Sequence, residues 1–285
     1  MVLRRFDVHR VTSVADAVSL RQRYGEDAAI YAGGTELLLA MKLGIARWSH
    51  LIDIKPIDQL RQVAATKDLL RIGATVTHWE LERDPVVAKA LPALARLEAD
   101  VANIRVRAAG TLAGNLAFAE PHADPPTLLV ALGARIVLES AAGSRTLLVG
   151  EFITGMYQTA LGPGELIVAI EIPLPARDVR MAYVKFKVLE RPSLAVAAVA
   201  TVRDGRFVGA PSVVIGAVDE VPRAVPTADF ASADVRDPRT AEALAEAARA
   251  AVDPSDDQAG SADYKRHLVG VFVQRALGAL IAGAA

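Results

Sequence analysis

Two glycine-rich segments of the chain carry the residue types that best suit binding of a phosphate group. The first is Gly33-Gly34-Thr35, and the second runs from Gly110 to Asn115 with the sequence Gly-Thr-Leu-Ala-Gly-Asn. Glycines let several backbone N–H groups turn toward one point, and a threonine hydroxyl adds a further donor. Either segment alone is more typical of a tight turn. Two of them, neither with a Walker or Rossmann pattern, favour a diphosphate held from two sides, as in a dinucleotide such as FAD.

The sequence does not indicate a metal site, a cysteine-based centre or a hydrolase or P-loop motif. The five histidines are scattered without the spacing of metal ligands, so we expect no metal site in this chain. The absence of cysteine excludes disulfides, cysteine-ligated zinc, an iron–sulfur cluster held by this chain and a thiol nucleophile. The sequence contains no Gly-x-Ser-x-Gly segment and no P-loop, and its acidic residues are spread as on solvated faces.

The composition indicates a folded chain of one large or two ordinary domains, with 285 residues of which 52 % are hydrophobic. A formal net charge of −1 argues against a nucleic-acid partner. No run of about 18 apolar residues occurs, because the longest candidate, 268–284, contains Gln274 and Arg275. We therefore expect no membrane span, no targeting signal and a cytoplasmic location. A mean hydropathy of +0.29 suggests that a partner covers some apolar surface.

The first glycine segment is predicted to join a strand to a helix. Residues 28–31 are apolar and favour a short strand, whereas 37–43 have a helical pattern. The elements expected around them are a helix over 14–24 capped by Ser13 and ended by Gly25, a strand at 50–54, a hairpin of 61–65 with 69–74, and helices that begin at Thr77 and Pro92.

The second glycine segment fits no single regular element. Residues 107–117 are too rich in glycine and alanine for a plain helix and too interrupted for a plain strand. Beyond this segment, Asp124 can cap a helix that begins with Pro125-Pro126. The elements expected next are a hairpin of 134–139 with 144–149 and a strand at 165–173, with Leu166, Val168, Ile170 and Ile172 on one side.

A proline-containing linker at 173–178 separates these elements from a region with a different order of predicted strands and helices. Asp204-Gly205 in that region predicts a tight turn between two strands. The elements expected there are strands over 181–188, 194–203 and 206–218, followed by helices over 238–252 and 261–283. Strands followed by helices, without alternation, indicate an α+β domain.

Several motifs of the chain occur in the order typical of one flavoprotein family. One is Tyr31-Ala32-Gly33-Gly34-Thr35-Glu36-Leu37, and the other is 106–115, which ends in Gly-Thr-Leu-Ala-Gly-Asn, followed by Pro121-His122-Ala123-Asp124. They resemble the FAD motifs of the medium subunits of molybdenum hydroxylases, which are carbon monoxide dehydrogenase-like and xanthine dehydrogenase-like flavoproteins. Further matches at 6–10, 165–173 and 264–266 extend the resemblance over nearly the whole chain.

The resemblance implies an α+β fold in two domains. Residues 1–176 would form a two-lobed FAD-binding domain of the PCMH type, with lobes at about 1–57 and 58–176. Residues 177–285 would form a small domain of three strands and helices, like the C-terminal domain of carbon monoxide dehydrogenase flavoproteins. The chain departs from the family motif at Ala113, which replaces a glycine, so a methyl group is expected to leave less room for backbone approach.

The resemblance also implies a role in a heteromeric oxidoreductase. FAD bound to this chain would take electrons from [2Fe–2S] clusters of a small partner subunit and pass them to an external acceptor. A large partner subunit would hold molybdopterin, and the complex would be a dimer of heterotrimers. The flavin would carry the redox chemistry, so no catalytic side chain is expected in this chain. The resemblance specifies neither the substrate of the complex nor its electron acceptor.

The residues expected to contact FAD follow from the same resemblance. Backbone groups of 32–35 and 111–115 would hold the phosphates, and Val101 and Ile167 would pack against the flavin by backbone or apolar contact. The full set is Ile30, Tyr31, Ala32, Gly33, Gly34, Thr35, Glu36, Leu37, Val101, Gly110, Thr111, Ala113, Gly114, Asn115, Asp124, Ile167 and Lys185.

Two members of this set have an alternative structural interpretation. Asp124 would bind a hydroxyl of the flavin side chain, or it serves only as the cap of the helix that follows, or it does both. Lys185 would contact FAD, but it lies on the same side of a strand as Lys187, so a solvated strand edge explains it equally well.

Two other functions remain open from the sequence. A stand-alone flavin oxidase or reductase usually has a larger second domain than 177–285, and some attach the flavin through histidine or cysteine. A structural subunit that has lost its flavin would have no need of Gly33-Gly34-Thr35, Thr111 and Asn115, all of which are intact. The colour of the purified protein, yellow or colourless, separates a flavoprotein from such a structural subunit.

Overall fold

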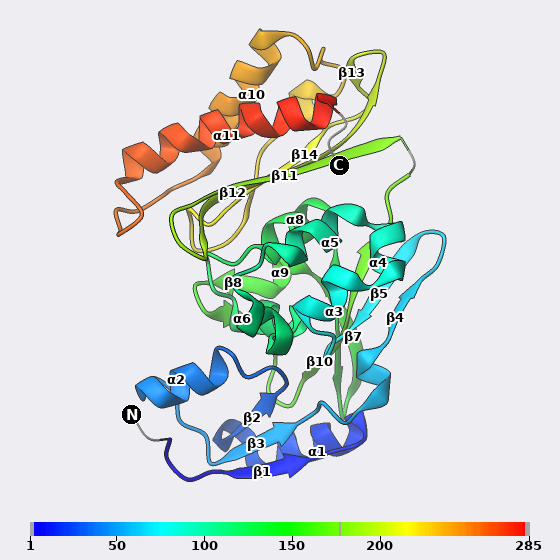
Figure 1. Cartoon of the computed structure of the whole chain (residues 1–285), viewed down its shortest axis with the longest axis vertical. Coiled ribbons are helices and arrows are strands. Elements are labelled where there is room, and N and C mark those ends of the chain that lie inside the picture. The colour runs from blue at the N-terminus through cyan, green and yellow to red at the C-terminus, as the bar shows by residue number, and fades with distance from the viewer. Residues whose placement is uncertain (1–2, 177, 283–285) are drawn as a thin grey trace.

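The computed structural model describes residues 3–176 and 178–282. Figure 1 shows three regions along the long axis of the molecule: a small lobe with the N-terminal strands, a larger lobe around strand β10 (Leu166–Pro173), and a C-terminal region. The sheet of the C-terminal region is covered by a pair of long helices, α10 (Pro238–Ala251) and α11 (Ala262–Ala282). This arrangement confirms the predicted α+β fold.

The first lobe is a parallel three-stranded sheet with two helices. In sheet order its strands are β1 (Asp7–Arg10), β3 (His50–Asp53) and β2 (Ala28–Tyr31). Its helices are α1 (Val14–Tyr24) and α2 (Leu37–Leu43), and the 3-10 helix η1 (Gly25–Asp27) follows α1. As predicted, Ser13 caps α1 by accepting a hydrogen bond from the Asp16 N–H group, and Gly25 ends it with a φ of 54°.

The second lobe is built on a five-stranded antiparallel sheet, which includes both predicted hairpins. In sheet order its strands are β4 (Val63–Ala65), β5 (Leu69–Gly73), β10, β6 (Arg135–Ser140) and β7 (Gly143–Leu148), while β8 (Ile153–Gly155) and β9 (Gln158–Thr159) form a separate pair. Its helices are the 3-10 helix η2 (Asp58–Arg61), α3 (His78–Arg83), α4 (Pro85–Ala90), α5 (Pro92–Ala99), α6 (Ile104–Ala109), α7 (Leu112–Phe118), α8 (Pro125–Ala131) and α9 (Val149–Phe152).

Strand β10 contributes side chains to the cores of both lobes, and its register shifts along its length. Its pairing with β6 slips between Ile167 and Ala169, which marks a β-bulge. Leu166 and Val168 therefore pack in the core of the first lobe, whereas Ile170 and Ile172 pack in the core of the second. The prediction that 166, 168, 170 and 172 lie on one side was wrong, because a bulge changes the alternation of side chains.

The second glycine segment joins two short helices, α6 and α7. Asn103 caps α6 by accepting hydrogen bonds from the backbone N–H groups of Arg105 and Val106. Thr111 caps α7 by accepting a hydrogen bond from the Gly114 N–H group. The prediction that no single helix spans 107–117 is therefore confirmed. Two short helices form instead, and each has its own N-terminal cap.

The C-terminal region is built on an antiparallel sheet. In sheet order its strands are β11 (Val179–Lys187), β12 (Pro192–Arg203), β14 (Ser212–Gly216) and β15 (Arg223–Ala224), with β13 (Arg206–Phe207) paired to β12 and the 3-10 helix η3 (Ala228–Phe230) before α10. Asp204 and Gly205 have φ angles of 51° and 78°, as the predicted tight turn requires. The third strand predicted over 206–218 is divided into β13 and β14, and β15 was not predicted.

The two faces of this sheet pack against different portions of the molecule. Val196 and Ile215 face the core formed with α10 and α11, whereas Ala197 and Val214 face the core of the second lobe. Helix α8 lies against β14 there, since a Cβ built at Gly216 would be 1.9 Å from Thr127 Oγ1. The C-terminal region is thereby fixed on the lobe that carries the second glycine segment.

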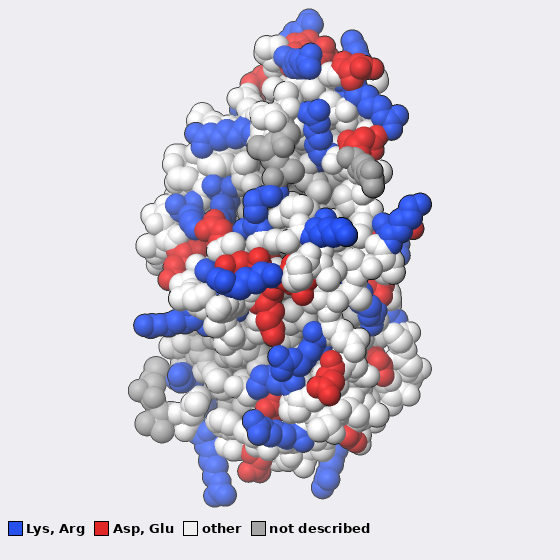
Figure 2. Space-filling model, turned by 45° about the vertical axis from the view of Figure 1, so that its right-hand side comes forward, with Lys and Arg blue, Asp and Glu red and all other residues white. Residues whose placement is uncertain are grey.

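The surface mixes charged and apolar side chains. Basic and acidic residues are interspersed over the face shown in Figure 2, as expected for a formal net charge of −1. Leu189, Ile45 and Val188 are 83, 78 and 68 % exposed, which fits the expectation of some uncovered apolar surface. Among the described residues, no helix is long and apolar enough to cross a membrane.

Candidate functional site

The two glycine-rich segments lie against each other, although they come from different lobes. A Cβ built at Gly33 would be 2.2 Å from the carbonyl oxygen of Ala109 and 2.7 Å from the Cα of Gly110. A Cβ built at Gly110 would be 3.4 Å from the Thr35 hydroxyl oxygen. Only glycine at position 33 permits this backbone approach. The structure therefore brings together the two segments that the sequence singled out.

A lysine that the sequence analysis missed holds the first segment. Lys55 Nζ donates a hydrogen bond to the Ala32 carbonyl oxygen at 3.3 Å and lies 3.6 Å from the centroid of the Tyr31 ring. The same ammonium group pairs with Asp53 Oδ1 at 2.7 Å. A cation beside this loop suits a phosphate ligand. The available signal was the position of Lys55 directly after the predicted strand at 50–54.

The second segment leaves one buried acceptor free. Asn115 Oδ1 is buried and receives no hydrogen bond from any residue in the described ranges. Thr111 Oγ1, in contrast, accepts a hydrogen bond from Gly114 at 3.0 Å. An unsatisfied buried polar atom costs about 1–3 kcal/mol, so Asn115 Oδ1 is suited to accept a hydrogen bond from a ligand.

Three of the expected contact residues belong to the core of the second lobe. Val101, Ala113 and Ile167 are only 5, 4 and 5 % exposed and lie in the same apolar cluster. The Ala113 methyl group packs in this core, so the loss of room expected beside the loop does not arise there. Val101 and Ile167 are thus largely covered by other residues of the chain.

Asp124 and Lys185 come together in a buried cluster that joins the second lobe to the C-terminal region. Asp124 Oδ1 accepts hydrogen bonds from Tyr183 Oη at 2.8 Å and from Lys185 Nζ at 2.7 Å. Lys185 Nζ also contacts Asp100, at 2.8 Å from its carbonyl oxygen and 3.0 Å from Oδ2. Asp124 does occupy the N-cap position of α8, but its side chain makes no capping hydrogen bond there. The Lys185 side chain is only 8 % exposed, so the interpretation as a solvated strand edge is wrong.

Burial and charge pairing set the protonation of this cluster. Burial raises the pKa of the Asp124 carboxyl above its usual value, although the hydrogen bonds from Lys185 and Tyr183 oppose the shift. Burial and the nearby Asp124 charge raise the pKa of the Tyr183 hydroxyl well above its usual value, so it stays a donor. Burial also favours the neutral form of Asp100, but its hydrogen bonds from Lys187 and Lys185 outweigh this effect and lower its pKa.

The turn between β11 and β12 reaches back to both lobes. Arg191 pairs with Glu36 at 2.8 Å, directly after the first glycine segment, and with Glu120 at 3.4 Å. Glu190 accepts hydrogen bonds from the Asn103 amide at 2.9 and 3.0 Å. Sequence reasoning missed these contacts because they join residues far apart in the chain.

The other two expected residues flank the first segment. Ile30 lies in β2, where it pairs with Ile52 of β3, and its side chain packs partly against the core of the first lobe. Leu37 is the first residue of α2 and is partly buried. Their backbones therefore fix where the loop 32–35 begins and ends.

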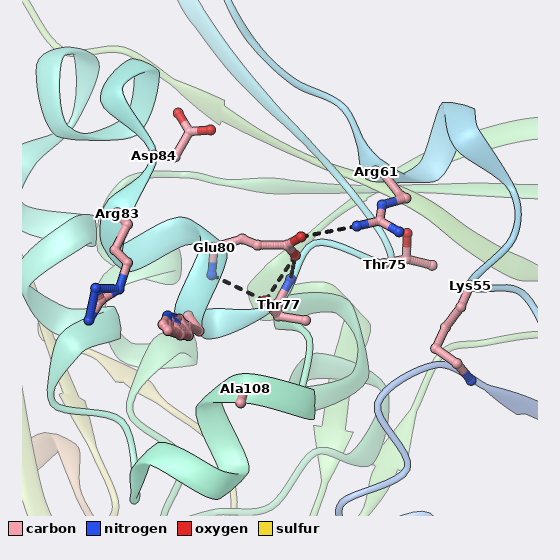
Figure 3. Close-up of a pocket in the computed structure, with 9 residues that line it drawn as sticks. Lys55, Arg61, Thr75, Thr77, Glu80, Arg83, Asp84 and Ala108 are labelled. Carbon is pink, nitrogen blue, oxygen red and sulfur yellow. Dashed lines mark hydrogen bonds and ion pairs between the residues drawn. The ribbon is translucent and has the colours of Figure 1, made fainter.

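A cavity of about 630 Å³ opens beside the glycine segments (Figure 3). Its charged and aromatic side chains come from the segment after β3, from η2, and from α3 and the residue that follows it. The residues that line it are Lys55, Arg61, Thr75, Thr77, Trp79, Glu80, Arg83, Asp84 and Ala108.

Comparison with known families agrees with this geometry. Residues 4–175 match the profile of the FAD binding domain in molybdopterin dehydrogenase, and residues 185–280 match that of the CO dehydrogenase flavoprotein C-terminal domain. The chain belongs to this flavoprotein family. It is therefore an FAD-binding oxidoreductase subunit, as the family resemblance implied.

Relatives within the family match over nearly their whole length. The chain is 36 % identical to the carbon monoxide dehydrogenase medium chain of Hydrogenophaga pseudoflava and 34 % identical to that of Afipia carboxidovorans, over 98 and 97 % of both chains respectively. Its structure matches a carbon monoxide dehydrogenase of Hydrogenophaga pseudoflava with a TM-score of 0.94 and 34 % identity, over 99 % of each chain. It matches quinoline 2-oxidoreductase of Pseudomonas putida 86 with the same TM-score, 31 % identity and coverage of 100 and 99 %.

The residues of this family member fit an FAD molecule. The close approach of Gly33 to Ala109 leaves the loop without side chains where the backbones meet. Asn115 Oδ1 offers a buried acceptor, and Lys55 supplies a cation beside the first segment. Both donors to Asp124 bind its Oδ1, and no hydrogen bond from the described residues of the chain reaches Oδ2. Oδ2 can therefore accept a hydroxyl group.

Proposed function

We propose that this chain is the electron-transfer subunit of a heteromeric molybdenum hydroxylase. Its FAD would receive electrons from [2Fe–2S] clusters of a small partner subunit and deliver them to an external acceptor. The observation that carries this proposal is the convergence of Gly33 and Gly110, together with the buried, unpartnered Asn115 acceptor of the second segment, in a chain of the molybdopterin dehydrogenase family. The absence of cysteine supports it, because the clusters then need another subunit.

We assign the residues of the chain to binding and orientation. The backbones of 32–35 and 111–115 hold the diphosphate, with the Lys55 ammonium nearby. Asp124 Oδ2 accepts a hydroxyl group of the flavin side chain. Lys185 directs its ammonium to Asp100 and Asp124, so it orients Asp124. When bound, FAD supplies the redox chemistry, since it accepts electrons singly or in pairs.

The proposed complex also contains a large molybdopterin subunit and forms a dimer of heterotrimers in the cytoplasm. Support for the partners comes from the relatives, which are named as medium chains of carbon monoxide dehydrogenase and as the medium subunit of nicotine 6-hydroxylase. The boundary near 176 between the two domains is supported by the family matches, which end at 175 and resume at 185.

Purification of the chain from its native source tests this function. We expect a yellow protein whose flavin is released as FAD by acid precipitation, because the chain has no cysteine for a covalent link and its five histidines show no recognisable attachment motif. A large molybdenum-containing chain and a small iron–sulfur chain should co-purify in equal amounts. A colourless chain would favour the structural subunit, and a yellow chain that oxidises an organic substrate without partners would favour a stand-alone flavoenzyme.

A further inference from the structure

A buried pair of polar side chains lies directly behind the second glycine segment. His78 is the first residue of α3, Glu98 belongs to α5, and the His78 Nδ1 and Glu98 Oε2 atoms are 2.5 Å apart. The two side chains are 3 and 0 % exposed. Neither residue is among those proposed to contact FAD, and neither lines the cavity of Figure 3.

The pair contacts the second segment through His78. The backbone N–H group of His78 donates a hydrogen bond to the Gly110 carbonyl oxygen at 3.0 Å, and the preceding residue, Thr77, forms an isolated β-bridge with Thr111. A Cβ built at Gly110 would be 3.3 Å from His78 Cδ2. Because Cδ2 and Nδ1 lie on opposite sides of the imidazole ring, Glu98 holds one edge of the ring while the other edge packs against the segment.

The contribution of this pair to stability does not explain its place in the structure. Helices α3 and α5 pack together in the apolar core of the second lobe, to which they contribute Leu81, Leu94 and Leu97. Glu98 Oε1 is buried there and receives no hydrogen bond from any described residue, which costs free energy. Apolar side chains of similar volume often replace such a pair without loss of stability. What they lack is a directional hydrogen bond, which fixes the rotation of the imidazole ring.

Helix α5 also connects the pair to the Asp124–Lys185 cluster. Asp100 directly follows α5, and its carbonyl oxygen and Oδ2 lie 2.8 and 3.0 Å from Lys185 Nζ. Lys185 in turn pairs with Asp124. The same helix is therefore tied to the second glycine segment by Glu98, through His78, and to the cluster by Asp100.

We propose that His78 and Glu98 are positioning residues for FAD. Their hydrogen bond fixes the imidazole edge against Gly110, so the backbone of 111–115 is already in place when the diphosphate arrives. Through α5 the pair also fixes this segment relative to Asp124. The inference rests on the proposed function, because it takes the second segment to hold the diphosphate of FAD. Neither side chain needs to touch the cofactor.

Substitutions of Glu98 in the full chain, purified with its accompanying chains and then freed of FAD, test this role. Glu98→Gln keeps the hydrogen bond, since an amide can either donate to or accept from His78 Nδ1. Glu98→Met removes it at similar volume, and the double variant His78→Leu/Glu98→Met replaces both polar groups. Val87→Ala is the matched control, because Val87 is buried in the same core but belongs to α4.

Three quantities are measured for each variant. Quenching of flavin fluorescence gives the FAD affinity, thermal melts of the FAD-free protein give its stability, and phosphorus NMR reports on the environment of the bound diphosphate. We expect Glu98→Met and the double variant to weaken FAD binding about tenfold and to shift the phosphorus resonances of bound FAD. The FAD-free double variant should melt no lower than wild type, because it buries no unpaired polar group.

The two remaining variants separate positioning from stability. Glu98→Gln should bind FAD as wild type does, whereas Val87→Ala should melt at a lower temperature but keep its FAD affinity and phosphorus resonances. The comparison of Glu98→Gln with Glu98→Met decides the matter even if the double variant does not fold.

Unchanged FAD affinity in Glu98→Met, or an equal loss in Glu98→Gln, would overturn the assignment while leaving FAD binding intact. An affinity that falls in step with the melting temperature in every variant, Val87→Ala included, would show that the pair is only part of the core and would overturn it too. Wild-type protein that takes up no FAD would instead overturn the function on which the assignment rests.

Discussion

Lys185 and Asp124 form a buried ion pair, with 2.7 Å between Nζ and Oδ1 and a separation of 61 residues along the chain. The lysine lies on β11 of the C-terminal region, and the aspartate directly precedes α8 of the second lobe. Their side chains are 8 and 3 % exposed. The C-terminal region therefore orients a carboxylate that belongs to the FAD-binding half of the molecule.

Replacement of Lys185 tests the strength of this pair. In Lys185→Met the buried Asp124 loses its cation, and breaking a buried pair costs about 3–5 kcal/mol. We expect the free energy of unfolding to fall by about 3 kcal/mol at pH 8, measured by urea denaturation. The loss should be smaller at pH 5, because Asp124, whose pKa burial already raises, then binds a proton more readily.

Lys187→Met is the matched control, since Lys187 lies on the same strand but its side chain is 37 % exposed and, among the described residues, pairs only with Asp100. We expect a change within about 1 kcal/mol for this exposed pair. Equal losses for Lys185→Met and Lys187→Met would show that burial of the Asp124 pair contributes nothing.

Gly33 is the position at which a single methyl group should abolish FAD binding. In Gly33→Ala the new Cβ would meet the Ala109 carbonyl oxygen at 2.2 Å, so the two segments must separate. Gly278→Ala is the control, because a Cβ at that helical position meets nothing within 4 Å. The measured quantity is the FAD content after purification. Full FAD content in Gly33→Ala would mean that the segments need not touch to bind the cofactor.

Replacement of Asn115 should lower FAD affinity without lowering stability, whereas replacement of Asn103 should lower stability without lowering FAD affinity. Asn115→Leu removes an unsatisfied buried acceptor, so the apoprotein should be at least as stable as wild type. Its FAD affinity should fall about tenfold, the equivalent of one hydrogen bond of about 1.4 kcal/mol. Asn103→Leu removes the cap of α6, so we expect a loss of about 1 kcal/mol in stability and little change in FAD affinity.

Thermal melts with and without FAD read out both quantities for these variants. A stability loss in apo Asn115→Leu, with unchanged FAD affinity, would show that Asn115 is a structural residue.

The lowered pKa of Glu120 predicts that this residue contributes to the loss of folding stability at acid pH. Burial alone would raise its pKa, but the hydrogen bond from His122 and the Arg191 charge outweigh burial and hold the pKa below the usual 4.5. The unfolded chain then binds more protons as the pH falls through 4.5, so the stability contributed by Glu120 is present above this pH and is lost below it. In Glu120→Gln the stability should fall less steeply between about pH 5 and pH 3. An identical slope in the variant would contradict the shift.

Local rules predicted much of the fold. Ser13 and Gly25 delimit α1, and Asp204-Gly205 makes the turn before β13, because capping and turn formation depend on neighbouring residues. The glycines of the two FAD segments were identified for the same reason. The local rules did not predict that the two segments contact each other. That expectation came only from the hypothesis that both segments hold one diphosphate.

The remaining features depend on long-range packing that spacing in the sequence does not encode. Asp124 has the local pattern of a helix cap, and only the position of β11 gives it Lys185 and Tyr183 as partners instead. The bulge at Val168 changes the alternation of side chains along β10, so spacing alone assigns Ile170 and Ile172 to the wrong core. Lys55 and the cavity beside it lie between elements of different lobes, so no single segment indicates them.

Anaerobic reduction of the bound flavin is the most direct test of the electron-transfer role. The FAD-loaded chain is mixed with purines, aldehydes and N-heterocycles, first alone and then with the co-purified molybdenum and iron–sulfur chains, and flavin bleaching is followed in the visible spectrum. We predict no bleaching by any substrate with the chain alone, and rapid bleaching by the substrate of the complex once both partners are present. Rapid bleaching of the isolated, metal-free chain by any of these compounds would contradict the account.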